Sequence, residues 1–210
     1  IDLNNFALAE TSIEIERRKL KLSGGLQDQF AAAFGGLNFL QFTKNQETLI
    51  SEISCKQDFL RFVENNILLI NSGKSRESSK IIEKQITMAQ KRDREFEASL
   101  RKMREFAFSL KSSLLRENYD DFIRVINDNW IAKKNSSKGI ANSFTDKIEQ
   151  DVSEVGGLSF KVSGAGGGGF CQVYTKPGER NLIADELIRL GYNVETVTFV
   201  NEGALAWNIS

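Results

Sequence analysis

Two carboxylates are the side chains of this sequence whose type and setting most suggest chemistry. Asp28 lies in SGGLQDQFAAAFGG, residues 23–36, at the start of a short alanine-rich segment bracketed by glycine pairs. Glu16 falls inside the apolar arc of a helical wheel drawn through the preceding segment. A buried carboxylate is costly unless it meets a cation or a metal ion. Glu16 therefore predicts either an ion pair with Lys19 at the edge of the core or a metal site.

Asp28 has two interpretations from its position alone. A carboxylate at the start of a helix is favoured by the helix dipole, so Asp28 fits an ordinary N-cap. The alternative is a functional carboxylate. The sequence contains no histidine, so any proton transfer within it must use a carboxylate, Lys, Tyr or Cys. Ser-His-Asp catalysis, Cys-His catalysis and histidine-based metal sites are thereby excluded within this chain.

A glycine cluster forms the third feature with chemical potential. Five of the seven residues 163–169 are glycine, within the stretch KVSGAGGGGF. A flexible linker would continue into polar sequence, but the flanks LSFKV and FCQVYT alternate apolar and polar residues and predict strands. A strand–glycine loop–strand unit is typical of a place where a phosphate or another backbone comes close. A ligand loop and a tight structural turn remain equal alternatives on these residues.

Composition narrows the class of protein. The chain has 210 residues, 40% of them apolar, with 28 basic and 28 acidic side chains. The balanced charge argues against a general nucleic-acid partner. The sequence has no apolar run of about 20 residues and no signal peptide, so we expect no membrane partner and a cytoplasmic location, with Cys55 and Cys171 as free thiols. The chain opens without Met just before a helix, and we expect that an earlier part is not shown.

The periodicity of the sequence predicts an α+β fold. Helical spacing covers residues 3–21, and strands are expected in LNFLQF, TLISEIS and NNILLINSG, the last leading into the basic stretch KSRES. Strands and helices are partly segregated, which favours α+β over a doubly wound sheet. We expect a domain boundary near residues 70–78. The other expected helices lie at 29–34, 76–91, 93–116, 119–134, 142–155 and 179–190, and the other expected strands at 158–163, 170–175, 193–200 and 204–209.

Several motifs in the same order together resemble the GHMP kinases, the family of galactokinase, homoserine kinase and mevalonate kinase. The stretch IEIERRKLKLSGGLQDQFAAAFGGLNFLQF is similar to the second signature region of the family, and GGLSFKVSGAGGGGF to the third. NSGKSRESSKIIEKQ and NDNWIAKKNSSKGIANSFTDKI extend the likeness through nearly the whole chain. The first signature, a Pro-x-x-x-Gly-Leu-x-Ser-Ser phosphate loop, has no match within these residues.

The resemblance implies an architecture. The chain is expected to form the C-terminal two-thirds of a two-domain GHMP kinase fold. Residues 1–75 would complete the N-terminal domain, and residues 76–210 would form a helix-rich, ferredoxin-like C-terminal domain.

The resemblance also assigns roles to residues. Asp28 stands where the family has an aspartate that takes the proton of the accepting hydroxyl or orients that hydroxyl, and Glu16 where it often has a magnesium-binding glutamate. Gly25 and Gln27 are expected to contact the substrate. The glycine loop is expected to shape the site and to donate amide hydrogen bonds from the stretch Ser163, Gly164, Ala165, Gly166, Gly167 and Gly168.

Within the family the likeness is strongest to kinases of a heptose 7-phosphate. It implies ATP-dependent, Mg2+-dependent phosphorylation of the anomeric C1 hydroxyl of D-glycero-D-manno-heptose 7-phosphate, giving the 1,7-bisphosphate for nucleotide-activated heptose and surface polysaccharide. Lys74 and Arg76 would then hold the dianionic 7-phosphate, as a point charge and a planar fork, or else be solvated surface charges. The alternatives are a kinase of fucose or galactose and a non-catalytic sugar-binding fragment. Whether the protein forms a homodimer is left open by the sequence.

Overall fold

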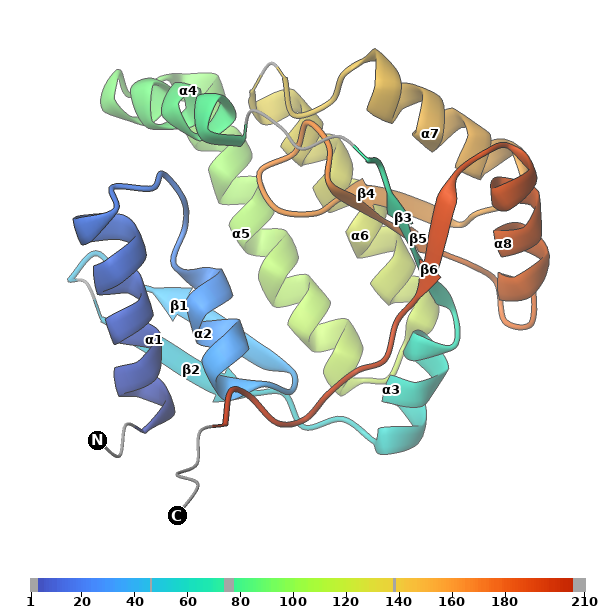
Figure 1. Cartoon of the computed structure of the whole chain (residues 1–210), viewed down its shortest axis with the longest axis horizontal. Helices are drawn as coiled ribbons and strands as arrows, with labels where there is room; N and C mark the ends of the chain where they lie inside the picture. Colours follow the sequence, from blue (N-terminus) through green and yellow to red (C-terminus); the bar gives the residue numbers. More distant parts are fainter. Residues whose placement is uncertain (1–3, 46, 74–77, 138, 206–210) are drawn as a thin grey trace. The chain divides into compact units, whose positions relative to one another are not determined.

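The structure of the chain, a computed structural model, is described for most of its length (Figure 1). The described residues are 4–45, 47–73, 78–137 and 139–205. Within these ranges, no helix combines the length and the apolar character needed to cross a bilayer.

The chain folds as two compact units. Unit 1 is Ile1–Ser54 together with Phe199–Ser210, and unit 2 is Cys55–Thr198.

Unit 1 packs two helices on a β-hairpin. Helix α1 begins at the N-cap Asn4, whose side chain accepts a hydrogen bond from the N–H of Ala7. The small side chains of Ala9 and Ala33 are buried beside Phe30 and allow the two helices a close approach. The elements of unit 1 are α1 (Asn5–Ile13), the π-helical turn η1 (Glu14–Lys19), α2 (Gln27–Phe34), β1 (Asn38–Phe42) and β2 (Thr48–Glu52).

The segment that follows residue 198 returns to unit 1 and bonds to the end of α2. The N–H of Gly36 donates to the carbonyl of Val200 over 3.0 Å, and the N–H of Ala204 donates to the carbonyl of Ala32 over 2.9 Å. These backbone bonds bring residues far apart in the sequence into one small unit.

Gly203 makes this return possible, because a Cβ at that position would lie 2.1 Å from the carbonyl oxygen of Ala33. We expect Gly203→Ala to lower the free energy of unfolding of unit 1 by about 1–3 kcal/mol, the usual range for overpacking. Urea unfolding of the full-length protein measures it. Gly25→Ala is the matched control, since a Cβ there would meet no atom within 4 Å. Equal stability of the two variants would contradict the close packing of the segment.

Unit 2 is built around a four-stranded antiparallel sheet in the order β4-β5-β3-β6. Its strand succession, with helices between β3 and β4 and one helix between β5 and β6, is the β-α-β-β-α-β pattern of ferredoxin-like domains. The elements of unit 2 are α3 (Gln57–Glu64), β3 (Ile67–Asn71), α4 (Ser78–Gln90), α5 (Arg94–Leu115), α6 (Tyr119–Ser136), α7 (Ser143–Glu154), β4 (Ser159–Val162), β5 (Phe170–Tyr174), α8 (Arg180–Arg189) and β6 (Asn193–Thr196).

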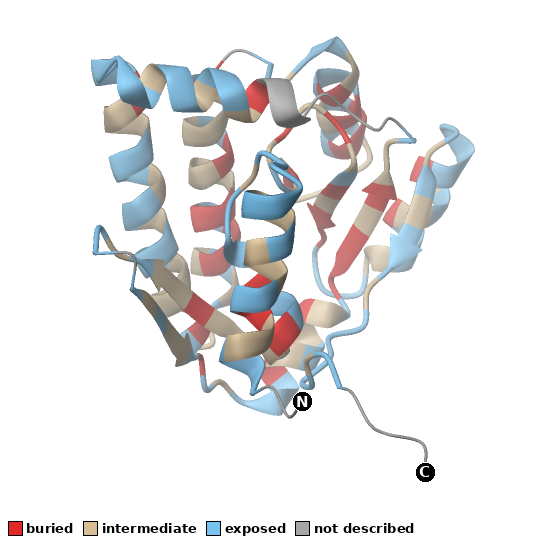
Figure 2. Cartoon of the chain, turned by 60° about the vertical axis from the view of Figure 1, so that its left-hand side comes forward, coloured by how far each residue is buried: buried red, intermediate tan, exposed pale blue. Residues whose placement is uncertain are grey.

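One face of the sheet of unit 2 forms the larger core. Val162, Val173 and Ile70 are fully buried, and their neighbours Lys161, Gln172 and Leu69 are less buried, as expected for residues on opposite faces of a sheet. They pack in one cluster with Ile148 of α7 and Leu187 of α8. Figure 2 shows the buried positions in red along these strands.

The predicted α+β class and the ferredoxin-like second part are confirmed. Helix α3 was not predicted, and the strand expected over 193–200 is too long, because β6 ends at Thr196. Thr196 pairs with Leu68, next to the first residue of β3, so the chain beyond it meets no further strand. Residues 204–205 are not in a strand either, and residues 206–209 lie outside the described part.

The two compact units do not coincide with the predicted division between residues 75 and 76. Strand β3 pairs with both β5 and β6, which ties residues 67–71 to the sheet of unit 2. The units therefore separate after Ser54. The assignment of residues 1–75 and 76–210 to the two family domains stays a prediction.

Candidate active site

Glu16 lies on a π-helical turn rather than on regular α-helix. At this turn the N–H of Leu20 donates to the carbonyl of Ile15, and the N–H of Leu22 donates to the carbonyl of Glu16, each over 2.9 Å. Such widened turns are rare in proteins as a whole, but they occur often at functional sites. The carboxylate of Glu16 is partly exposed instead of buried in an apolar arc.

The side-chain contacts of Glu16 within the described part of the chain are made by one of its two carboxylate oxygens. Nε2 of Gln29 donates to Oε2 of Glu16 over 2.7 Å. Nη1 of Arg17 lies 3.5 Å from the same oxygen. The expected alternative of a pair with Lys19 is not formed, since these two neighbours take its place.

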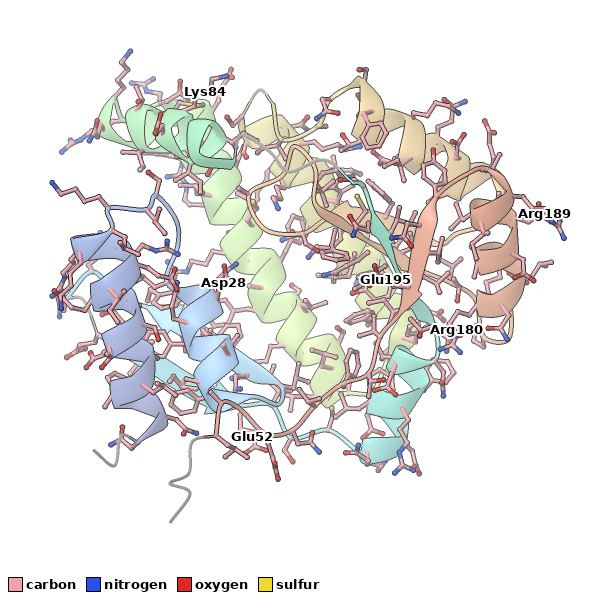
Figure 3. The ribbon with its side chains drawn as sticks, in the orientation of Figure 1. Asp28, Glu52, Lys84, Arg180, Arg189 and Glu195 are labelled. Carbon is pink, nitrogen blue, oxygen red and sulfur yellow. The ribbon has the colours of Figure 1, made fainter. Side chains whose placement is uncertain are left out.

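Asp28 lies in the first turn of α2 with its side chain exposed (Figure 3). The N-cap residue of this helix is Leu26, and no side chain caps the helix by a hydrogen bond. Asp28 is thus not the N-cap, although its charge still lies at the favourable end of the helix dipole.

A pocket in unit 1 brings the two predicted carboxylates together. Its volume is about 270 Å³, and Glu16 and Asp28 both line it. The other lining residues are Leu8, Ser12, Arg17, Gln29, Ala32, Ala33 and Ala204. Because α1 packs against α2, residues that are distant in the sequence line one pocket, which holds two carboxylates and one guanidinium group.

Arg17 fixes the loop that leads to Asp28. Its Nε donates to the carbonyl of Gly25 over 3.1 Å, and its Nη1 donates to the carbonyl of Leu22 over 3.3 Å. A Cβ at Gly24 would lie 2.7 Å from the guanidinium carbon, so the glycine leaves room for this clamp. Gly25 thus holds its carbonyl toward Arg17, and Gln27 is exposed as the first residue of α2.

Sequence reasoning did not single out Arg17 or Gln29 as parts of the site. One weak feature of the sequence could have indicated Gln29, since it is a polar residue among the apolar and small residues that α2 buries. Nothing in the sequence distinguishes Arg17 from the other basic residues of its segment.

The glycine loop belongs to unit 2 and is a built loop rather than a linker. Gly166 and Gly167 have φ of 101° and 78°, in the left-handed region that favours glycine. A Cβ at Gly166 would lie 2.9 Å from the carbonyl oxygen of Ile140, and one at Gly167 would lie 2.8 Å from a methyl group of Ile81. Close packing on this side requires bare backbone, whereas a Cβ at Gly164 would meet open space.

Several backbone amides of the loop have no hydrogen-bond partner within the described residues. The N–H of Gly167 donates to the carbonyl of Ile140, and that of Gly169 donates to Oγ of Ser72 over 2.8 Å. Among the hydrogen bonds of the described residues, the N–H groups of four loop residues have no partner: Gly164, Ala165, Gly166 and Gly168.

Two partly buried lysines, Lys133 and Lys161, lie at the start of the loop. Nζ of Lys133 donates to the carbonyl of Gly164 over 2.6 Å and to that of Val162 over 3.3 Å. Burial and the neighbouring charge of Lys161 lower the pKa of Lys133 to about 8. Burial also lowers the pKa of Lys161. Ser163 accepts a hydrogen bond from Nε2 of Gln172 over 3.2 Å.

The donor set of the pocket fits the magnesium ion that the family resemblance implies. Glu16 and Asp28 offer carboxylate oxygens, and Mg2+ is usually held by one or two carboxylates together with water and substrate phosphates. No group of three or more His, Cys, Asp or Glu side chains suited to a metal occurs among the described residues. Lys74 and Arg76 lie outside the described residues.

Comparison with known proteins points to kinases. No protein-family model matches the chain. The chain is 29% identical over 211 residues to D-glycero-alpha-D-manno-heptose 7-phosphate kinase of Campylobacter jejuni, an alignment that covers 100% of this chain and 61% of that protein.

Solved structures share the fold. A D-glycero-D-manno-heptose 1-phosphate kinase from Bacteroides thetaiotaomicron matches with a TM-score of 0.70 and 24% identity, over 100% of this chain and 57% of that one. Streptococcus pneumoniae phosphomevalonate kinase, in complex with phosphomevalonate and AMPPNP, matches with a TM-score of 0.70 and 16% identity, over 94% of this chain and 62% of that one. The chain thus spans about three fifths of the length of these relatives.

The resemblance to the GHMP kinases is confirmed, and the chain has the fold of that family. The heptose 7-phosphate kinase of Campylobacter jejuni is a relative whose similarity extends along the whole of this chain.

Proposed function

We propose that the protein is an ATP-dependent sugar kinase, and that its acceptor is the anomeric C1 hydroxyl of D-glycero-D-manno-heptose 7-phosphate. The pocket that unites Asp28 and Glu16 carries this proposal. Phosphoryl transfer needs positioning and charge stabilisation more than strong base chemistry. In a chain without histidine, one carboxylate of the pocket can orient the acceptor and the other can hold a cation that stabilises the phosphate charge. The similarity of the whole chain to a kinase of this sugar phosphate supports the choice of acceptor.

Asp28 is the proposed base for the accepting hydroxyl. The C1 oxygen attacks the γ-phosphorus of ATP, its bond to phosphorus forms as the bond to the β-bridging oxygen breaks, and ADP leaves. The hydroxyl proton passes to a carboxylate oxygen of Asp28. The carboxylate of Asp28 is exposed at the N-terminus of α2 and is therefore accessible for this transfer.

Glu16 is the proposed magnesium ligand of the chain. A bound Mg2+ would neutralise charge on the phosphates during transfer. Glu16 would hold the cation on the wall of the pocket that Asp28 also lines. Gln29 and Arg17 keep the carboxylate in one orientation.

The glycine loop is the proposed second anion contact. The unpartnered amides of its glycines and of Ala165 suit hydrogen bonds to phosphate oxygens. Lys133 holds the carbonyl groups at the start of the loop and so keeps that turn in shape.

A substrate panel tests the proposal. The full-length protein is incubated with MgATP and heptose 7-phosphate, fucose, galactose or mevalonate, and ADP release is measured. The largest kcat/KM is expected for heptose 7-phosphate, with product phosphate on C1 by NMR. A clear preference for fucose or galactose would replace the acceptor and retain the kinase. Sugar binding without ADP release on any substrate would instead favour a non-catalytic sugar-binding protein.

A further inference from the structure

Gln29 is a buried amide beside the proposed cation ligand. Its exposed fraction is 7%, and it lines the pocket with Glu16 and Asp28. Its Nε2 donates to Glu16, while its Oε1 is buried and has no hydrogen-bond partner in the described part of the chain. A buried acceptor without a partner costs free energy, so the fold retains this amide at a penalty to stability.

The helical geometry of α2 points the side chains of the adjacent residues Asp28 and Gln29 in different directions. Successive side chains on a helix diverge by about 100°. Asp28 is therefore exposed while Gln29 is turned into unit 1, where it reaches η1. One helical turn thus holds the carboxylate proposed to act on the acceptor and also restrains the carboxylate proposed to bind the metal.

Both neighbours of Glu16 act on the same oxygen. Gln29 and Arg17 contact Oε2, which leaves Oε1 as the oxygen without a contact among the described residues. Arg17 is the weaker restraint, because its nitrogen is 3.5 Å away and its guanidinium already donates to the loop carbonyls of Leu22 and Gly25. The 2.7 Å bond from Gln29 therefore sets the orientation of the carboxylate.

We infer that Gln29 is a positioning residue for a hard divalent cation: its amide occupies Oε2 of Glu16 and presents Oε1 to the metal. The inference rests on the proposed role of Glu16. Residues that orient a metal ligand through a hydrogen bond strengthen metal binding, and their loss typically lowers affinity by about 10–100-fold.

Gln29→Met tests the inference, because it keeps the length of the side chain and removes both polar atoms. Mn2+ is titrated into the full-length protein, and free Mn2+ is followed by electron paramagnetic resonance. We expect Mn2+ affinity to fall by about 10-fold or more. The melting temperature should fall little, because the buried unpaired oxygen is removed together with the bond. Gln150→Met is the matched control, since it deletes an exposed bond of 2.8 Å from Gln150 to Glu154, and its Mn2+ affinity should stay unchanged.

Gln29→Glu provides a second variant with an opposite expectation. It places a second carboxylate against Glu16, so the protein without metal should melt at a lower temperature. Added Mn2+ should then raise the melting temperature more than in the unsubstituted protein, because the cation relieves the repulsion. A protein with Gln29→Glu that responds to Mn2+ no more than the unsubstituted one would overturn the inference. So would a folded Gln29→Met protein with Mn2+ affinity within twofold of normal.

Glu16→Gln separates the inference from the proposed function. If this variant binds Mn2+ as well as the unsubstituted protein, Glu16 is not a metal ligand, and the proposed metal site and the role of Gln29 fail together. If Glu16→Gln weakens Mn2+ binding but Gln29→Met does not, only the role of Gln29 fails.

Discussion

Asp28→Asn in the full-length protein is expected to lower kcat by roughly 10²-fold or more, the scale on which general bases act. The amide has the size of the carboxylate but cannot accept the hydroxyl proton or orient the hydroxyl by its charge. Sugar binding should change much less, because the pocket keeps its shape. Steady-state kinetics with saturating MgATP and calorimetry with the sugar measure the two effects separately.

Asp58→Asn is a close control for this variant. Helix α3 begins with Gln57 and Asp58, as α2 begins with Gln27 and Asp28, and both aspartates are exposed in the first turn. The two substitutions remove the same interaction with a helix dipole, so any common loss of stability belongs to that effect. Near-normal turnover of the Asp28 variant would exclude the proposed catalytic role and leave Asp28 only the role of a charge that stabilises the helix end.

The two carboxylates of the site could be predicted from the sequence. That they line the same pocket could not be predicted from local sequence patterns. Asp28 stands out by residue type at the start of a stretch of small and apolar residues, and Glu16 by its place inside the apolar arc of the helical wheel. They share a pocket because Ala9 and Ala33 allow α1 and α2 to pack closely around Phe30. The family motifs supplied that pairing, since spacing alone does not fix how two helices pack.

Three features of the fold were not predicted from the sequence: the return of the chain to unit 1, the π-helical turn and helix α3. The return of the chain to unit 1 depends on bonds such as that from Ala204 to Ala32, which no local pattern announces. The π-helical turn at Glu16 has only 6 residues, too few for its wider turn to show in the hydrophobic pattern of the sequence. Helix α3 was overlooked although Phe59 and Val63 stand four residues apart and are both buried, because the helix is only 8 residues long and lies between two strands.

Lys74 and Arg76 offer the sharpest test of which acceptor the proposed kinase uses. Both lie outside the described residues, but the residues just before them are placed. Strand β3 ends at Asn71, and Ser72 bonds twice with Gly169, through its N–H and through its hydroxyl. The chain therefore leaves β3 beside the end of the glycine loop, and we propose that the two basic side chains hold the 7-phosphate of the acceptor.

Replacing both Lys74 and Arg76 with Ala is expected to lower kcat/KM for heptose 7-phosphate by about one to three orders of magnitude. Hydrogen bonds to charged groups contribute about 1.5–3 kcal/mol each, and two neighbouring ones need not add. Activity on an unphosphorylated sugar should change little or even rise, because no dianion has to be matched. The double variant Lys91→Ala with Arg94→Ala, which removes two exposed basic residues from the same unit, should leave both activities unchanged.

The contrast between the two acceptors distinguishes a substrate contact from an effect on folding. A general loss of folded protein would lower both activities by the same factor, whereas a lost phosphate contact lowers only the activity that needs the phosphate. Equal loss on both acceptors, or no loss on either, would exclude the phosphate contact. If the preferred acceptor proved to be fucose or galactose, the roles of Lys74 and Arg76 would fall with the heptose assignment. Asp28 and Glu16 would keep their proposed roles, because every acceptor hydroxyl needs the same proton transfer and the same bound phosphates.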